Sequence, residues 1–121
     1  MDPQLLELAL IFEQECRYVI SVERLPTKVR FILVGGYNID LFYRSKTGSY
    51  SYTVFKAEQR VIGWDNAPHY RELENFPHHF HREDSTPVTS ALSNIPIEDI
   101  VIVAREVNRF IENKLSEVHE E

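Results

Sequence analysis

The sequence predicts an α+β domain in which an antiparallel meander sheet of five to six strands is flanked by an N-terminal and a C-terminal helix. Apolar residues recur at helical spacing near both ends of the chain, and they alternate with polar residues in the middle. Short turns separate the alternating stretches, as expected for strands that pair with their sequence neighbours. With 121 residues the chain is long enough to close one core without disulfides, so residues 1–121 are expected to form a single domain.

A first helix is expected over residues 3–16. Asp2 supplies a capping carboxylate, and Pro3 has a φ angle that is already close to helical. The apolar residues that follow fall on one helical face: Leu5, Leu8, Ala9, Phe12 and Cys16. Because an apolar face of this kind must be buried, the helix is expected to cover one side of the sheet.

Five strands are expected between the first helix and the middle of the chain. Their ranges are residues 17–23, 29–33, 39–44, 50–56 and 60–64, each with alternating or β-branched and aromatic side chains. Gly35 and Gly36 supply the positive φ angles that a tight reversal needs. The fifth strand ends just before Asp65, and functional residues are commonly placed at such strand exits.

The segment 65–96 has no helical periodicity. Residues 78–82 suit a short sixth strand, and residues 82–94 are expected to be an exposed loop. Ser93 or Asn94 can then cap the last helix, in which Pro96 occupies the first turn. Its apolar side chains recur every three or four residues: Ile97, Ile100, Val103, Ala104, Val107, Phe110, Ile111, Leu115 and Val118.

The composition is that of a globular protein with no membrane segment. No apolar run is long enough to cross a bilayer, and the first residues lack the features of a signal peptide. The single cysteine, Cys16, suits a reducing compartment, so a cytoplasmic protein is expected. The net charge is −6, but eight of the thirteen Lys and Arg residues lie between positions 17 and 64, which leaves room for a local contact with an anion.

Four of the five histidines lie between positions 69 and 81. They belong to two segments, residues 64–69 (Trp-Asp-Asn-Ala-Pro-His) and residues 76–81 (Phe-Pro-His-His-Phe-His). Imidazole carries protons and binds metals near neutral pH, so this density indicates a site. If the second segment is extended, His79 and His81 share one face at a spacing of about 7 Å, and His78 points to the other face.

One interpretation of the histidines is metal-independent acid and base chemistry on an RNA phosphodiester. One imidazole would take the proton of the ribose 2′-hydroxyl and a second would protonate the leaving 5′-oxygen, while Asp65 orients an imidazole. Arg60, Arg71 or Arg82 would stabilise the phosphate charge. Tyr50 and Tyr52 are candidates for stacking on unpaired bases.

A second interpretation is a metal site. His79 and His81, with His69 or Asp65, would give three ligands of the type that zinc and related divalent transition metals accept, with one position open for water. A third interpretation is structural, with the imidazoles bonded to backbone carbonyls or to nearby carboxylates. The residues alone leave all three open.

The two histidine-bearing segments, with the Tyr-rich strand at residues 50–52 ahead of them, resemble the signature of the TumE-type toxins of bacterial and archaeal toxin–antitoxin pairs, and the resemblance extends over nearly the whole chain. Members often have a second His where this chain has Tyr70, and a basic residue where it has Phe80. The resemblance implies one TumE-like domain and a toxin that acts on RNA. It also implies a helix-turn-helix antitoxin as the partner.

Several positions match the family signature and carry the suspected site: Asp65, Asn66, His69, His78, His79 and His81. The resemblance does not assign an acid or a base among them. The expected geometry is that Asp65 or His69 approaches His79 and His81 near Arg60 or Arg82. Whether the chain forms a homodimer is left open.

Overall fold

The computed structural model describes residues 1–84 and 86–120. The side chains of residues 118–120, which include Val118 of the predicted apolar stripe, lie outside the described part. The elements in chain order are α1 (Pro3–Glu15), β1 (Val19–Arg24), β2 (Val29–Leu33), β3 (Tyr37–Arg44), β4 (Ser49–Lys56), β5 (Gln59–Asp65), β6 (His79–His81), β7 (Pro87–Thr89) and α2 (Pro96–Glu120).

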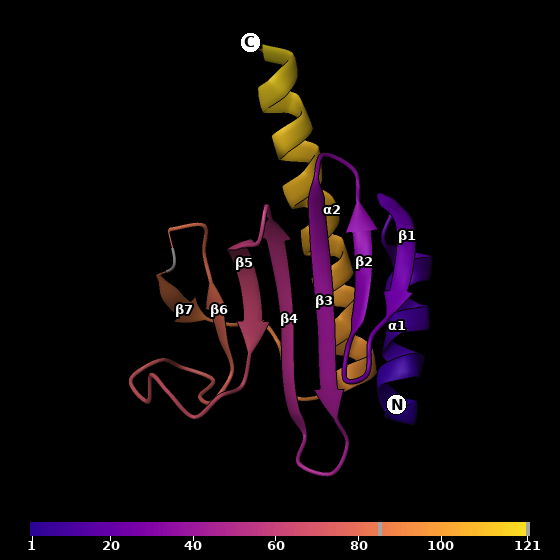
Figure 1. Cartoon of the computed structure of the whole chain (residues 1–121). Helices are drawn as coiled ribbons and strands as arrows, with labels where there is room; N and C mark the ends of the chain where they lie inside the picture. The colour runs from indigo at the N-terminus through magenta and orange to yellow at the C-terminus, as the bar shows by residue number, and fades with distance from the viewer. Residues whose placement is uncertain (85, 121) are drawn as a thin grey trace.

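The seven strands form one antiparallel sheet in which every strand pairs with its sequence neighbours, in the order β1 to β7 (Figure 1). This confirms the predicted α+β class, the meander and the two flanking helices. The sheet exceeds the predicted five to six strands because residues 87–89 pair with β6, with Val88 opposite Phe80. The prediction that residues 82–94 are an exposed loop was therefore wrong for β7, and also for Leu92, which is completely buried.

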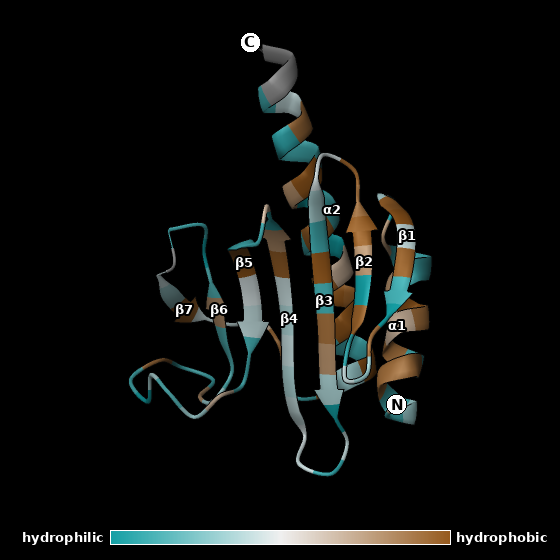
Figure 2. Cartoon of the chain, viewed as in Figure 1, coloured by the Kyte–Doolittle hydropathy of each residue, from teal (hydrophilic) through white to brown (hydrophobic). Residues whose placement is uncertain are grey.

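Both helices lie behind the sheet in the view of Figure 1, so the sheet has one covered face and one open face. The strands alternate accordingly: residues 29, 31 and 33 of β2 are buried, while residues 30 and 32 are only half-buried. Hydrophobic residues concentrate in α1 and the neighbouring strands, whereas the segment between β5 and β6 is largely hydrophilic (Figure 2). The core thus lies between the sheet and the helices, and the opposite face is available to solvent.

Hydrogen bonds of two polar side chains, Asp2 and Asn108, fix the helices. Asp2 accepts hydrogen bonds from the backbone N–H groups of Gln4 and Leu5, as the N-cap prediction requires, and also from the N–H and hydroxyl of Ser45. Asn108 of α2 donates to the carbonyl of Glu15 at 3.0 Å. Its side-chain oxygen also accepts from the N–H of residue 17 at 2.9 Å. The end of α1 is thereby joined to the middle of α2.

The segment before α2 is held by Asp99, a residue in the first turn of that helix. Its carboxylate accepts from the backbone N–H groups of Ser93 and Asn94 at 2.9 and 3.0 Å. Ser93 and Asn94 thus act as backbone donors to a residue inside the helix. Asp99 is 2% exposed, so these bonds are made away from solvent.

The open face of the sheet carries an ion-pair cluster at Asp40. The carboxylate lies 2.7 Å from Nε of Arg30 and 2.8 Å from Nζ of Lys28. Burial alone would raise the pKa of Asp40, but the hydrogen bonds from Arg30 and Lys28 outweigh it and hold the pKa below the ordinary value of 3.8. The ionised form of Asp40 therefore stabilises the folded state.

Replacing Asp40 by Asn is expected to lower the free energy of unfolding by about 1–3 kcal/mol at pH 7. Since the folded-state pKa is depressed, the stabilisation is fully present above pH 3.8 and is lost as the pH falls through the folded-state pKa. Urea denaturation of both chains from pH 7 down to pH 2.5 checks this. A difference between the two chains that stays constant over that range would contradict the assignment.

Candidate active site

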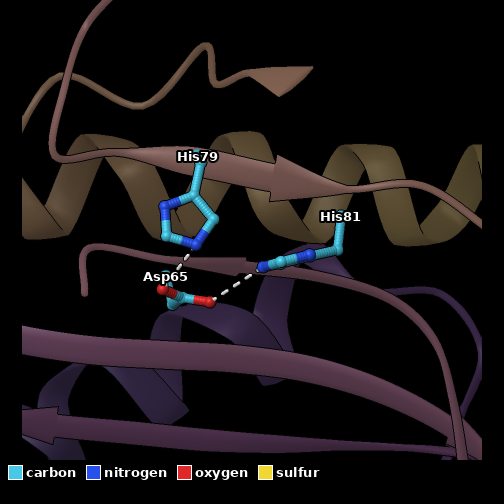
Figure 3. Close-up of side chains that lie close together, drawn as sticks. All are labelled: Asp65, His79 and His81. Atoms are coloured by element: carbon cyan, nitrogen blue, oxygen red, sulfur yellow. Dashed lines mark ion pairs between the residues drawn. The ribbon is translucent and has the colours of Figure 1, made fainter. Parts of the chain in front are cut away.

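Asp65, His79 and His81 converge on the open face of the sheet, and we call them the Asp65–His79–His81 centre. One carboxylate oxygen of Asp65 lies 2.8 Å from Nε2 of His79, and the other lies 3.3 Å from Nε2 of His81 (Figure 3). The expectation that Asp65 approaches both histidines is confirmed. Only Asp65 is appreciably open to solvent, with 22% of its side chain exposed against 2% for His79 and 8% for His81.

Strand register brings the three side chains together. Asp65 is paired with His79 and Gly63 with His81 across β5 and β6. Residues directly opposite one another point to the same face, so both imidazoles stand on the same side of the sheet as the carboxylate. Gly63 presents no side chain beside His81, which therefore reaches Asp65 diagonally. The alternate positions, Trp64 and Phe80, meet in the covered layer with ring centroids 5.0 Å apart.

The segment between β5 and β6 folds over the centre. The Tyr70 ring stands edge-on to His79, with centroids 5.1 Å apart, and 6.1 Å from His81. The loop thus places an aromatic ring against the centre. This contact could not be predicted from the sequence, because spacing alone does not show where a loop residue folds back.

The centre opens into a depression of about 610 Å³ between β4, β5 and the following loop. Besides the centre, the depression is lined by Phe42, Ser49, Tyr50, Ser51, Arg60, Asn66, Ala67, Pro68, His69 and Tyr70. Arg60 is therefore beside the centre. Burial lowers the pKa of His81, and the charge of Arg60 lowers it further, although Asp65 acts in the opposite direction. His81 is accordingly neutral near pH 7 and meets Asp65 through a hydrogen bond.

His78 lies on the other face of the sheet, as predicted from strand alternation. Its Nδ1 is 2.6 Å from the hydroxyl of Tyr50, and it is 6% exposed. Burial lowers the pKa of His78 and raises that of Tyr50, so both groups are neutral in this hydrogen bond. The structure thus separates His78 from the other two histidines and places it in the covered layer.

The remaining predicted site residues have different surroundings. Tyr50 and Tyr52 stack on each other in the core, with centroids 4.8 Å apart, and Tyr52 is 1% exposed, so this ring is not open to a base. Asn66 accepts from the N–H of Tyr50 and donates to the carbonyl of Gly48, which ties the loop after β5 to the start of β4. Arg82 lies away from the centre, 3.9 Å from Asp84.

His69 is exposed and lines the depression, but the group of possible metal-ligating atoms is formed by the centre itself. The ligand atoms of Asp65, His79 and His81 all lie within 4.8 Å of one another. Asp65 is thus the third member beside the two histidines. Among the described residues, neither helix has the length and apolar character that are needed to cross a membrane.

These features define a class of protein: a small α+β domain with a meander sheet, covered on one face and carrying an aspartate and two histidines in a depression on the other. The family model of toxin TumE matches residues 4–115, and the chain belongs to this family. Members of this family are the toxins of toxin–antitoxin pairs, so membership implies an antitoxin partner. Comparison with curated proteins gave no match, and comparison with solved structures gave none either.

Proposed function

We propose that this chain is the toxin of a prokaryotic toxin–antitoxin pair, and that it inhibits growth in the cytoplasm by cleaving RNA at the Asp65–His79–His81 centre. The partner that neutralises it would be a helix-turn-helix antitoxin. The observation that carries the proposal is the convergence of one carboxylate and two imidazoles on the floor of an open depression.

The surroundings of the centre support RNA as the substrate. RNA carries its own nucleophile, the ribose 2′-hydroxyl, so a cleaving enzyme needs only to move protons and to stabilise charge. Arg60 lies where it can meet a phosphate, and His69 supplies an exposed imidazole in the same depression. The aromatic rings of Phe42 and Tyr70 also line the depression and offer apolar contact to a base.

The reaction that fits these groups is an internal transfer of the phosphoryl group. The 2′-hydroxyl loses its proton to a base of the site, and its oxygen attacks the adjacent phosphorus. The bond from phosphorus to the 5′-oxygen breaks, and that oxygen takes up a proton. The products are a 2′,3′-cyclic phosphate and a free 5′-hydroxyl, and no further reactant is required.

Mapping of RNA 5′ ends after induced expression tests the proposal. New 5′-hydroxyl ends are expected with the wild-type chain and not with the Asp65→Asn variant, because Asn cannot replace the charge of the carboxylate. Asp84→Asn is the matched control, since this exposed aspartate lies in the turn between β6 and β7 and outside the depression. Intact RNA in growth-arrested cells that express the wild type would contradict RNA cleavage.

A second function rests on a different observation, the burial of His79 and His81. Buried imidazoles bonded to a carboxylate also suit a noncatalytic module, in which the centre shapes a loop that docks a protein or a nucleic acid. This function predicts growth inhibition without new RNA ends. It also predicts that changes on the exposed loop, such as His69→Ala, weaken inhibition more than Asp65→Asn does.

A further inference from the structure

We propose that the Asp65–His79–His81 centre binds one divalent first-row transition-metal ion through the Asp65 carboxylate and the Nε2 atoms of both histidines. The inference rests on the proposed function for its catalytic meaning, because it names the cofactor of the same site. Binding itself can be measured without RNA.

The distances within the centre suit one shared ion. Atoms that bind zinc or a similar ion at about 2.0–2.2 Å stand roughly 3 Å or more from one another. The Nε2-to-oxygen distances are 2.8 Å and 3.3 Å, and all the ligand atoms lie within 4.8 Å of one another. Only a small adjustment of the carboxylate is needed to surround an ion.

The second nitrogen of His79 indicates which nitrogen faces the ion. Nδ1 lies 3.1 Å from the carbonyl oxygen of Pro77. A carbonyl only accepts, so Nδ1 donates this hydrogen bond, and Nε2 is the ring nitrogen that remains to bind an ion. Nε2 lies 2.8 Å from a carboxylate oxygen, so an ion bound there would take the place of the hydrogen that joins the two atoms. Metal-ligating histidines are typically held in this way by a carbonyl behind the ring.

His81 turns its Nε2 to the other oxygen of the same carboxylate, but no carbonyl of a described residue lies behind its ring. Its Nδ1 is buried and has no hydrogen-bond partner among the residues that the structure describes. The contact of Nε2 with Asp65 is therefore what directs the ring. Both imidazoles thus turn their Nε2 atoms toward one point. Direct acid and base chemistry on a substrate would instead need a ring nitrogen that is turned to the solvent.

The donor set selects the kind of ion. Two imidazoles and one carboxylate favour zinc, iron, manganese or a related ion over magnesium and calcium, which prefer oxygen ligands alone. Three ligands leave further positions open. Because the partly exposed Asp65 lines the depression, those positions face the place proposed for RNA, where they can take water or a phosphate oxygen.

Calorimetric titration with zinc chloride, and separately with manganese chloride, tests the inference on the full chain. The protein is purified without a His tag, stripped with a chelator that is then removed, and checked by circular dichroism. We expect one ion per chain for one of these metals, and an affinity at least about 100-fold lower for Asp65→Asn and His79→Gln. His69→Gln is the control and is expected to bind like the wild type, since His69 lies outside the group of convergent atoms.

The results of the titration and of an RNA cleavage assay distinguish the proposed metal site from the proposed RNA cleavage. Absence of saturable binding to the wild type, or equal binding by Asp65→Asn, overturns the metal site even if His79→Gln does not fold. RNA cleavage by the stripped chain in the presence of chelator overturns the ion as the cofactor of the reaction and leaves the proposed function intact. Stoichiometric metal on a chain that leaves RNA intact supports the site and overturns the proposed function.

Discussion

Asp65→Asn, His79→Gln and the variant that carries both changes are expected to lose growth inhibition to the same extent. Each should lower the rate of RNA cleavage by about 10²- to 10⁴-fold. The effects should not add, because groups that act as one unit are disabled by the loss of any member. Colony counts after induction, with matched protein levels, measure inhibition, and timed RNA digestion measures the rate.

The comparison distinguishes one centre from two independent groups. If Asp65 and His79 acted separately, the double variant would be slower than the wild type by the product of the two single-variant factors, and so slower than either single variant. Asp84→Asn is again the control and should inhibit growth like the wild type. Full growth inhibition by the Asp65→Asn variant would show that the activity does not depend on the centre.

Phe12→Ala is expected to have the largest effect on stability. Phe12 of α1 is completely buried, and its ring lies 4.9 Å from that of Phe31 in β2. Removing the ring loses buried area and leaves a cavity between helix and sheet, which together cost about 3–5 kcal/mol. A domain of this size is stable by only about 5–15 kcal/mol, so much of its stability depends on this contact.

Urea denaturation measures the loss, and Leu10→Ala supplies the matched control. Leu10 lies on the same helix but is 60% exposed, so its truncation should change the free energy of unfolding by less than about 0.5 kcal/mol. Comparable losses for the two variants would show that α1 does not pack against the sheet as described.

The fold was largely predictable because periodicity decides it. The stripes that predict α1 and α2 extend over many residues, and β2 to β5 alternate over five to eight residues. β7 was not predictable, since three residues contain too little of a pattern to distinguish a strand from a loop. The role of Asn108 was not predicted for a related reason. A polar residue on a buried helix face does not reveal that it bonds the end of another helix until the two helices are packed together.

The site was predictable where strand geometry governs it. Alternation separates His78 from His79 and His81, and the end of the fifth strand presents Asp65; both follow from the sequence. The partner of each imidazole nitrogen did not follow, because it depends on register and on the course of the loop. Tyr50 and Tyr52 show where prediction fails: as aromatic residues on a strand they were candidates for base stacking, but both are buried in the fold.

β6 pairs with each neighbouring strand over only three residues, so it can separate from the sheet more easily than the longer strands. This strand has three residues and meets each neighbour through three register pairs, and it carries both histidines of the centre. Segments with few buried contacts open at a lower free-energy cost than a helix-covered core, and their amides exchange hydrogen accordingly. When β6 separates from β5, Asp65 parts from both imidazoles while the rest of the domain stays folded. The fraction of molecules with an assembled centre is therefore set by this local equilibrium and not by global unfolding.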